Sequence, residues 1–150
     1  MTAATESTCL PAGLPAPGVT DLDRPYWTAA AEGSLLVQQC AACHTAQWPP
    51  EEICASCHST ERTWAASAGT GKVFSWTRIW HPVHASLQDA CPYIVVVVAL
   101  DDFPVLMIGN LMGPAGQTVE AGTPVRASFE RHDGYGLVQW EPIRGERPSS

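Results

Sequence analysis

Two copies of Cys-x-x-Cys-His lie close together in this chain and restrict its fold more than any other feature. They are Cys40-Ala-Ala-Cys43-His44 and Cys54-Ala-Ser-Cys57-His58, and ten residues separate the second cysteine from the third. Two such turns can supply four soft ligands to one tetrahedral metal site. The same five-residue motif also attaches c-type haem. One tetrahedral metal site would indicate a structural module, whereas two attached haems would indicate an electron carrier.

A single four-thiolate site fits the surrounding sequence better than two haems. Residues 1–20 have no basic start and no continuous apolar run, so no signal peptide supports the export that haem attachment requires. The sequence after the motifs is strand-like, unlike that of small helical cytochromes. Disulfides would require an oxidising compartment, for which no targeting segment argues. We therefore predict that Cys40, Cys43, Cys54 and Cys57 bind one zinc ion, with iron as the alternative in the same site.

The other histidine and cysteine residues around these motifs have simpler interpretations. His44 and His58 each follow a ligating cysteine, at a turn position where glycine is common, and we interpret them as bystanders; substitute ligands are the alternative. Cys9 lies in the leader and Cys91 precedes Pro92 in a loop. We interpret both as simple small residues, with a reactive Cys91 as the alternative.

Charge and hydropathy exclude several classes of partner. The net charge is -7 with only eight basic residues, which leaves little to neutralise phosphates, so we expect no nucleic-acid binding. The longest apolar run, Tyr93–Leu100, fits a buried strand and is shorter than the roughly 18 residues that a membrane span requires. We expect a soluble, cytoplasmic protein without membrane contact.

The order of segments predicts a mainly β protein: a small zinc ribbon followed by a five-stranded OB-fold barrel, with a short N-terminal helix. Asp23, Pro25 and Gly33 mark the start and end of the helix. We interpret the Gly69–Gly71 break as a bulge in one long bent strand, which brings the barrel to five strands. The predicted strands are 34–39, 45–48, 63–67, 73–80, 93–100, 105–110, 125–130 and 137–141. The chain divides into a flexible leader (1–20), the helix (21–33), the zinc ribbon (34–61), the OB-fold domain (62–143) and a flexible tail (144–150).

Four residues outside the cysteine motifs are candidates for contact with a substrate or a partner. Tyr26 and Trp27 on a short helix must pack on the ribbon, on the main domain or on a partner protein. His81 and His84, followed by Asp89, lie in the long connection between the first two barrel strands, and they form the one cluster in which we look for acid/base chemistry. No nucleophile–base pair, paired-carboxylate site, phosphate loop or dinucleotide fingerprint accompanies them. Nothing in the chain looks like a complete active site.

The ordered combination of motifs resembles the DUF35 family. A histidine follows each cysteine pair, where members of that family more often have glycine. The resemblance covers about residues 21–143, and it implies an N-terminal helix and a rubredoxin-like zinc ribbon before an OB-fold domain. The motifs that carry it are Pro25-Tyr26-Trp27, Leu35–Cys40, Trp48-Pro49-Pro50, Cys54-x-x-Cys57, Gly71–Thr77, Pro92–Val95, Gly109–Leu111 and Gly122–Val125.

The resemblance implies an accessory role in acyl-CoA metabolism. Relatives accompany thiolase-like proteins, including thiolases, acyltransferases and the side-chain aldolases of steroid breakdown, and some are fused to or bound by hydratase-like domains. The expected complex is a heterotetramer or larger that acts on an acyl-CoA thioester, with the catalytic residues on the partner. Two alternatives stay open: a single-stranded nucleic-acid binder that uses the OB fold, and a rubredoxin-like electron carrier that holds iron.

Overall fold

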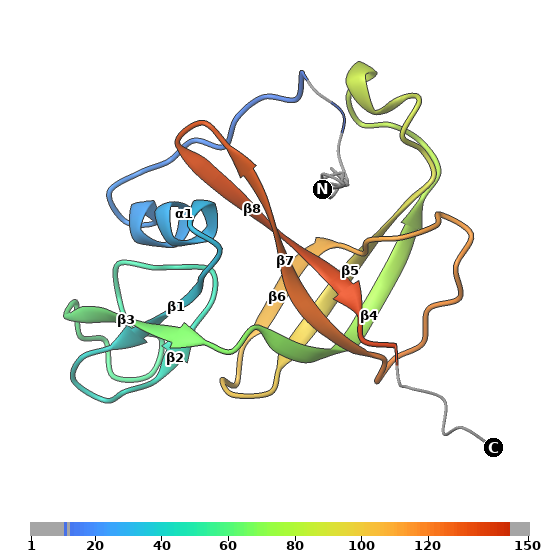
Figure 1. The fold of residues 1–150 in the computed structure, drawn as a ribbon. Helices are drawn as coiled ribbons and strands as arrows, with labels where there is room; N and C mark the ends of the chain where they lie inside the picture. Colours follow the sequence, from blue (N-terminus) through green and yellow to red (C-terminus); the bar gives the residue numbers. More distant parts are fainter. Residues whose placement is uncertain (1–10, 12, 145–150) are drawn as a thin grey trace, which may run out of the picture.

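The computed structural model describes residue 11 and residues 13–144 of the 150-residue chain. Residues 1–10 and 12 of the predicted leader and residues 145–150 of the predicted tail lie outside the described part. The described part contains one α-helix, a short 3₁₀ turn and two antiparallel sheets (Figure 1). The elements are α1 (Arg24–Ala31), β1 (Leu35–Cys40), β2 (Ala46–Gln47), β3 (Arg62–Ser67), β4 (Thr70–Ile79), η1 (Ala85–Leu87), β5 (Tyr93–Leu100), β6 (Leu106–Asn110), β7 (Pro124–His132) and β8 (Tyr135–Pro142).

The predicted helix is confirmed, and its boundary residues explain where it begins and ends. Pro25 lies in the first turn, where its missing N–H costs no helical hydrogen bond. Gly33 follows the helix with a φ of 83°, in the left-handed region that favours glycine. Asp23 occupies the N-cap position, but its side chain does not cap the helix. Its carboxylate instead accepts hydrogen bonds from the backbone N–H (2.7 Å) and the hydroxyl (2.9 Å) of Thr20, which fixes the preceding turn.

Strand β3 belongs to the small sheet, whose order is β2-β1-β3. It pairs along the whole of β1, from Leu35 opposite Ser67 to Cys40 opposite Arg62. The interpretation of the Gly69–Gly71 break as a bulge within one barrel strand is therefore wrong, because the chain passes there from one sheet to the other. Gly69 has a φ of 72°, and the Asp102 carboxylate accepts hydrogen bonds from the Ser67 hydroxyl (2.9 Å) and the Ala68 N–H (2.8 Å).

The five-stranded sheet predicted for the OB fold is confirmed, and β3 is not one of its strands. Its order is β6-β5-β4-β7-β8, and a parallel bridge between Leu111 and Trp140 joins its two ends into a barrel. The bulge in this sheet lies at Phe74 in β4. Because one extra residue reverses the direction in which the following side chains face, Trp76 pairs with the buried Val96 of β5, although Trp76 itself is 40% exposed.

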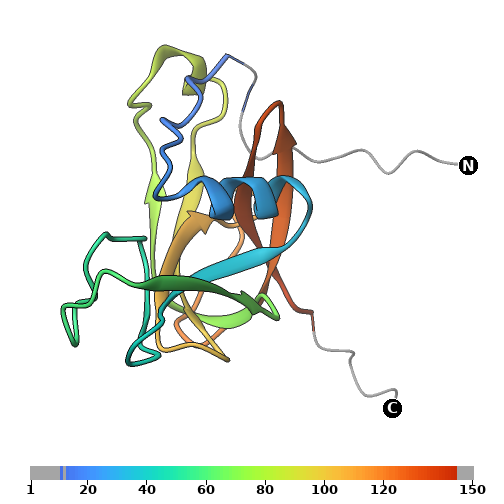
Figure 2. The same ribbon diagram turned by 90° about the vertical axis from the view of Figure 1, so that its left-hand side faces the viewer.

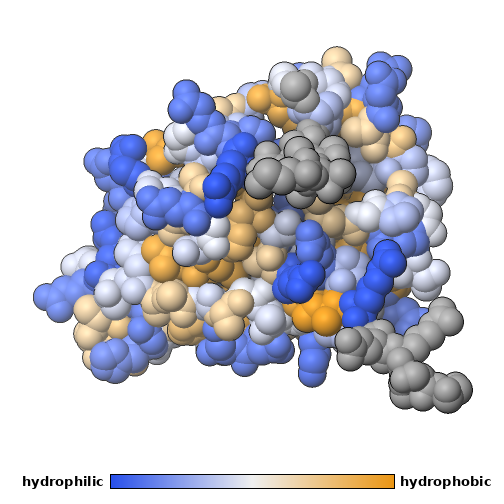
Figure 3. Space-filling model, in the orientation of Figure 1, coloured by the Kyte–Doolittle hydropathy of each residue, from blue (hydrophilic) through white to orange (hydrophobic). Residues whose placement is uncertain are grey.

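One hydrophobic core joins the helix, the ribbon and the barrel. Buried Tyr26 and Ala30 of α1 and Val37 of β1 belong to the same cluster as Val96 and Trp140 of the barrel. Figure 2 shows α1 crossing in front of the barrel strands, above the small sheet. On the face drawn in Figure 3, apolar surface gathers between α1 and strands β7 and β8, with polar side chains around it.

A glycine makes the close packing of α1 possible. A Cβ atom at Gly136 of β8 would collide with the backbone of Ala30 and Ala31 in the helix. The side chain of Ala30 is itself fully buried. The helix therefore packs backbone against backbone on β8, a contact that only the smallest residue permits.

None of the helices among the described residues is long and apolar enough to cross a membrane.

Candidate metal centre and the adjoining groove

Each Cys-x-x-Cys motif forms a tight turn whose last residue is a histidine. The His44 N–H donates to the Cys40 carbonyl and the His58 N–H donates to the Cys54 carbonyl, each at 3.0 Å. Both histidines have left-handed backbone, with φ values of 61° and 63°, a conformation that costs a non-glycine residue roughly 1–2 kcal/mol. Both side chains are exposed, and the cluster of potential metal ligands contains cysteines alone. This arrangement agrees with their interpretation as turn residues.

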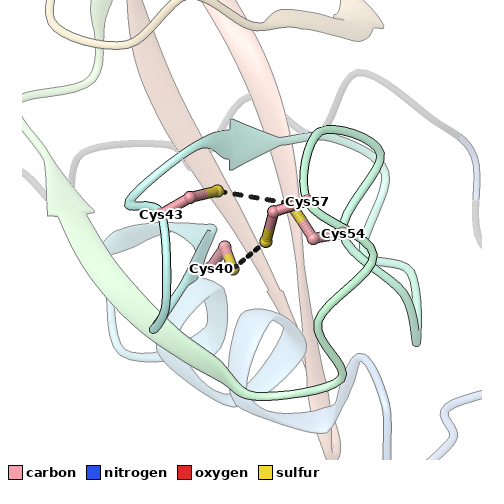
Figure 4. A group of neighbouring side chains, drawn as sticks. All are labelled: Cys40, Cys43, Cys54 and Cys57. Carbon is pink, nitrogen blue, oxygen red and sulfur yellow. Dashed lines mark hydrogen bonds between the residues drawn. The ribbon is translucent and has the colours of Figure 1, made fainter.

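The two turns face each other and bring the four predicted ligands together (Figure 4). All four Sγ atoms lie within 4.8 Å of one another. The Sγ atoms of Cys40 and Cys57 are 3.6 Å apart, and so are those of Cys43 and Cys54. A disulfide would require about 2.05 Å, and all four thiols are free. A tetrahedron with metal–sulfur bonds of 2.3 Å has edges of about 3.8 Å, so zinc or iron fits this cage.

The electrostatics of the cage also favour a cation. The hydrogen bond between the Cys43 thiol and the Thr45 hydroxyl, 3.2 Å long, lowers the pKa of Cys43 to about 6. The Ser59 backbone lowers the pKa of Cys57, but the neighbouring sulfurs of Cys43 and Cys40 outweigh it and raise that pKa to about 12. A bound metal ion would offset this unfavourable effect of the neighbouring sulfurs on the Cys57 thiolate.

Two glutamines connect the cage to the rest of the ribbon. Gln38 is 1% exposed, and its side-chain amide bonds to both the N–H and the carbonyl of Glu51, each at 3.0 Å. The side-chain amide of Gln47 donates to the side-chain Oε1 of Gln38 (2.9 Å) and accepts from the N–H of Ala55 (3.1 Å), the residue after Cys54. Sequence reasoning missed both residues, because a glutamine in a short strand normally points to solvent.

The structure places Tyr26 and Trp27 where the helix, the ribbon and the barrel meet. Tyr26 is 5% exposed, and burial raises the pKa of its hydroxyl. Its ring centroid lies 4.4 Å from that of Trp48 in the ribbon and 5.1 Å from that of Trp27. The Trp27 ring also approaches Tyr135 of β8 edge-on, at 6.4 Å. Together the aromatic rings of the helix and the ribbon line one side of an open groove of about 340 Å³.

His81 and His84 lie elsewhere, in the connection that includes η1. Both are exposed, and neither lines the groove nor joins the cysteine cluster. His84 has a local structural role, because its Nδ1 accepts a hydrogen bond from the Ser86 N–H (3.2 Å) at the start of η1. The structure thus separates these histidines from the aromatic pair of α1.

Sequence reasoning also missed a buried polar group on the barrel. Glu130 of β7 is 8% exposed, and its carboxylate contacts His132 Nε2 (3.0 Å) and Gln139 Nε2 (3.4 Å). The His132 ring stacks on Tyr135, with centroids 4.8 Å apart. Nothing in the local sequence distinguishes Glu130 from a solvent-facing strand residue.

Two family models match consecutive parts of the chain. The rubredoxin-like zinc ribbon domain of ChsH2 matches residues 27–61, and the C-terminal OB-fold domain of ChsH2 matches residues 64–130. These ranges agree with the positions of the cysteine cage and of the barrel.

Two curated proteins are similar to the chain over part of their length. One is named probable enoyl-CoA hydratase alpha subunit, from Thermomonospora curvata: it is 36% identical over 104 residues, which are 69% of this chain and 32% of that protein. The other, from Mycobacterium tuberculosis, is named 3-oxo-4,17-pregnadiene-20-carboxyl-CoA hydratase alpha subunit: it is 28% identical over 145 residues, which are 88% of this chain and 45% of that protein. The chain thus spans less than half the length of the curated relatives it matches.

Two solved structures share the fold. A chain of the Ltp2-ChsH2(DUF35) aldolase superposes with a TM-score of 0.75 and 31% identity, over 85% of this chain and 98% of that one. A DUF35 protein of unknown function from Sulfolobus solfataricus superposes with a TM-score of 0.58 and 12% identity, over 83% and 87% of the two chains. The second likeness concerns the fold alone.

Proposed function

This chain belongs to the DUF35 family, and on that premise we propose that it is a non-catalytic accessory subunit of a thiolase-like enzyme. That enzyme, an aldolase, a thiolase or an acyltransferase, makes or breaks carbon–carbon bonds in acyl-CoA thioesters. One observation carries the proposal: the likeness covers 98% of a chain from the Ltp2-ChsH2(DUF35) aldolase, at 31% identity. The curated relatives, whose names refer to subunits of CoA-thioester hydratases, support the same area of metabolism.

The described residues support a role without catalysis by this chain. The cysteine cage offers four protein sulfurs to one ion, which leaves no open coordination position for a substrate. The exposed His81 and His84 have no buried side-chain partner among the described residues. We propose that the partner contributes the catalytic residues, while this chain completes the substrate pocket and stabilises the partner.

The metal has a structural role in this proposal. Cys40, Cys43, Cys54 and Cys57 would hold zinc, with iron as the alternative, and the bound ion would cross-link the two turns of the ribbon. The free thiols suit a reducing compartment, so we place the chain in the cytoplasm. The complex would be a heterotetramer or larger, with an acyl-CoA thioester as its substrate.

A pull-down from the native host tests the proposal. The tagged full-length chain should retain a thiolase-like protein in near-equal amount, identified by mass spectrometry, and the eluate should contain zinc. Recovery of the chain alone would contradict it. So would recovery with single-stranded nucleic acid that dissociates steeply as salt increases.

A further inference from the structure

The four cysteines of the cage differ in their exposure to solvent. Cys40 and Cys54, the first cysteine of each turn, are both only 4% exposed. Cys43 and Cys57, the second cysteine of each turn, are exposed. Oxidation of a cysteine depends on its exposure as well as on its thiolate character. A small oxidant in solution therefore reaches the second cysteine of each turn more readily than the first.

Each exposed cysteine lies beside a buried cysteine of the opposite turn. The Sγ atoms of Cys43 and Cys54 are 3.6 Å apart, and so are those of Cys57 and Cys40. Figure 4 draws both contacts as dashed lines between the two turns. Each pair must approach by about 1.5 Å to reach the roughly 2.05 Å of a disulfide bond. An exposed sulfur that is oxidised first thus has a second sulfur within reach.

Hydrogen bonds connect the two turns to the rest of the ribbon without the metal. The Ala55 N–H donates to the side chain of Gln47 (3.1 Å), and the Ala41 N–H donates to the Glu61 carbonyl (3.0 Å). Each donor belongs to the residue that follows the first cysteine of its turn. These bonds keep the turns close while metal ligands are being lost, and a disulfide between the turns then takes over the cross-link.

We propose that the cysteine cage is a redox-sensitive switch, in which hydrogen peroxide converts the metal-binding thiolates into disulfides between the two turns. Cys43 pairs with Cys54, and Cys57 pairs with Cys40. A structural zinc site needs four protein ligands, so the first disulfide, which removes two of them, releases the ion. The inference rests on the metal assignment made above and goes beyond it, because it gives the cage a second, metal-free state.

The oxidation balances with peroxide as the only oxidant. The Cys43 thiolate attacks one oxygen of hydrogen peroxide, the O–O bond breaks, and the departing hydroxide takes up a proton to become water. The resulting sulfenic acid is attacked at sulfur by the Cys54 thiolate. The S–S bond forms, the S–O bond breaks, and the second hydroxide also leaves as water. The two sulfurs lose two electrons and the peroxide gains them. The second pair reacts in the same way.

Treatment of the full-length zinc-loaded chain with hydrogen peroxide tests the inference. A metallochromic indicator should detect the release of about one zinc ion per chain, and dithiothreitol with added zinc should restore metal binding. Cleavage after Glu51 and Glu52 separates the two turns, so mass spectrometry without reduction should find their peptides joined, with the cysteines paired as proposed. Cys91→Ser is the matched control, because this thiol lies outside the cage, and it should change the rate of zinc release by less than about twofold.

Four results would overturn the inference: zinc that stays bound in excess peroxide, disulfides confined within single turns, oxidation that dithiothreitol does not reverse, or loss of zinc release in Cys91→Ser. The last result would assign the reaction with peroxide to Cys91. A chain that binds no zinc before oxidation would overturn the metal assignment together with the switch. Recovery of the partner in the pull-down is a separate measurement, so the failure of the switch and the failure of the accessory role are distinguishable.

Discussion

At the scale of single residues, the cysteine cage has a strict chemical requirement. Its Sγ atoms are close enough for one ion, and the pKa of Cys57 is raised to about 12 by its sulfur neighbours. A structural zinc site binds its ion through four protein ligands. Loss of one cysteine would leave only three. The stability of the ribbon should therefore depend on every one of the four cysteines.

Cys40→Ser or Cys57→Ser should release the metal and unfold the ribbon, because binding of a structural metal contributes directly to folding. Cys91→Ser is the control, since this half-buried thiol lies outside the cage. Metal analysis and thermal unfolding of the purified variants measure both effects. Unchanged metal content and melting temperature in the cage variants would remove the four-thiolate assignment.

Gly136 should be equally intolerant of change, for a steric reason. Gly136→Ala inserts a Cβ into the backbone of Ala30 and Ala31, and we expect it to lower the free energy of unfolding by about 1–3 kcal/mol as α1 moves away from the barrel. Gly116→Ala, at a position with open space around it, should change it by less than about 0.5 kcal/mol. Urea unfolding compares the two. Equal midpoints would show that the helix does not pack on β8 in this way.

At the scale of elements, the small sheet depends on a buried amide as well as on its metal. Gln38 lies in the middle of β1, and its amide holds the backbone of Glu51, which follows the Pro49-Pro50 turn. It also accepts from Gln47 at the end of β2. The two adjacent glutamines of β1 differ sharply, because Gln39 is only half-buried and donates once, to the His44 carbonyl.

Gln38→Met should destabilise the ribbon by about 1–3 kcal/mol, because an apolar side chain of similar length leaves two backbone groups and one amide unpaired. Gln39→Met should cost less than about 1 kcal/mol, since water can replace its single bond. Urea unfolding of the metal-loaded proteins measures the difference. A smaller loss in Gln38→Met than in Gln39→Met would contradict the bracing role of Gln38.

The sequence predicted the elements better than their partners. A continuous apolar run placed β5 correctly and Gly33 placed the end of α1, because burial and turn chemistry are local properties. The pairing of β3 with β1 could not be read in this way: Thr63–Ser67 is a strand in either sheet, and only the three-dimensional path at Gly69 decides which one. The groove was missed for the same reason, since Trp27 and Ile108 are far apart in the chain.

At the scale of the whole molecule, the ribbon and the barrel form one packed unit. Tyr26 and Val37 belong to the same core as Trp140, and the Tyr26 ring contacts Trp48 next to the ribbon turn. The cysteine motifs are the part of this arrangement that the sequence predicted most directly, because all four ligands lie within two short local turns. We propose that a metal bound by these cysteines holds the ribbon in place for a partner.

The most direct test of the central claim is the carbon–carbon bond activity of the thiolase-like partner, measured with its acyl-CoA substrate in the presence and absence of this chain. We predict that the partner alone is inactive or unstable, that adding the metal-loaded chain restores activity up to a fixed stoichiometry, and that the chain alone shows none. Full and stable activity of the partner without this chain would contradict its role as an accessory subunit.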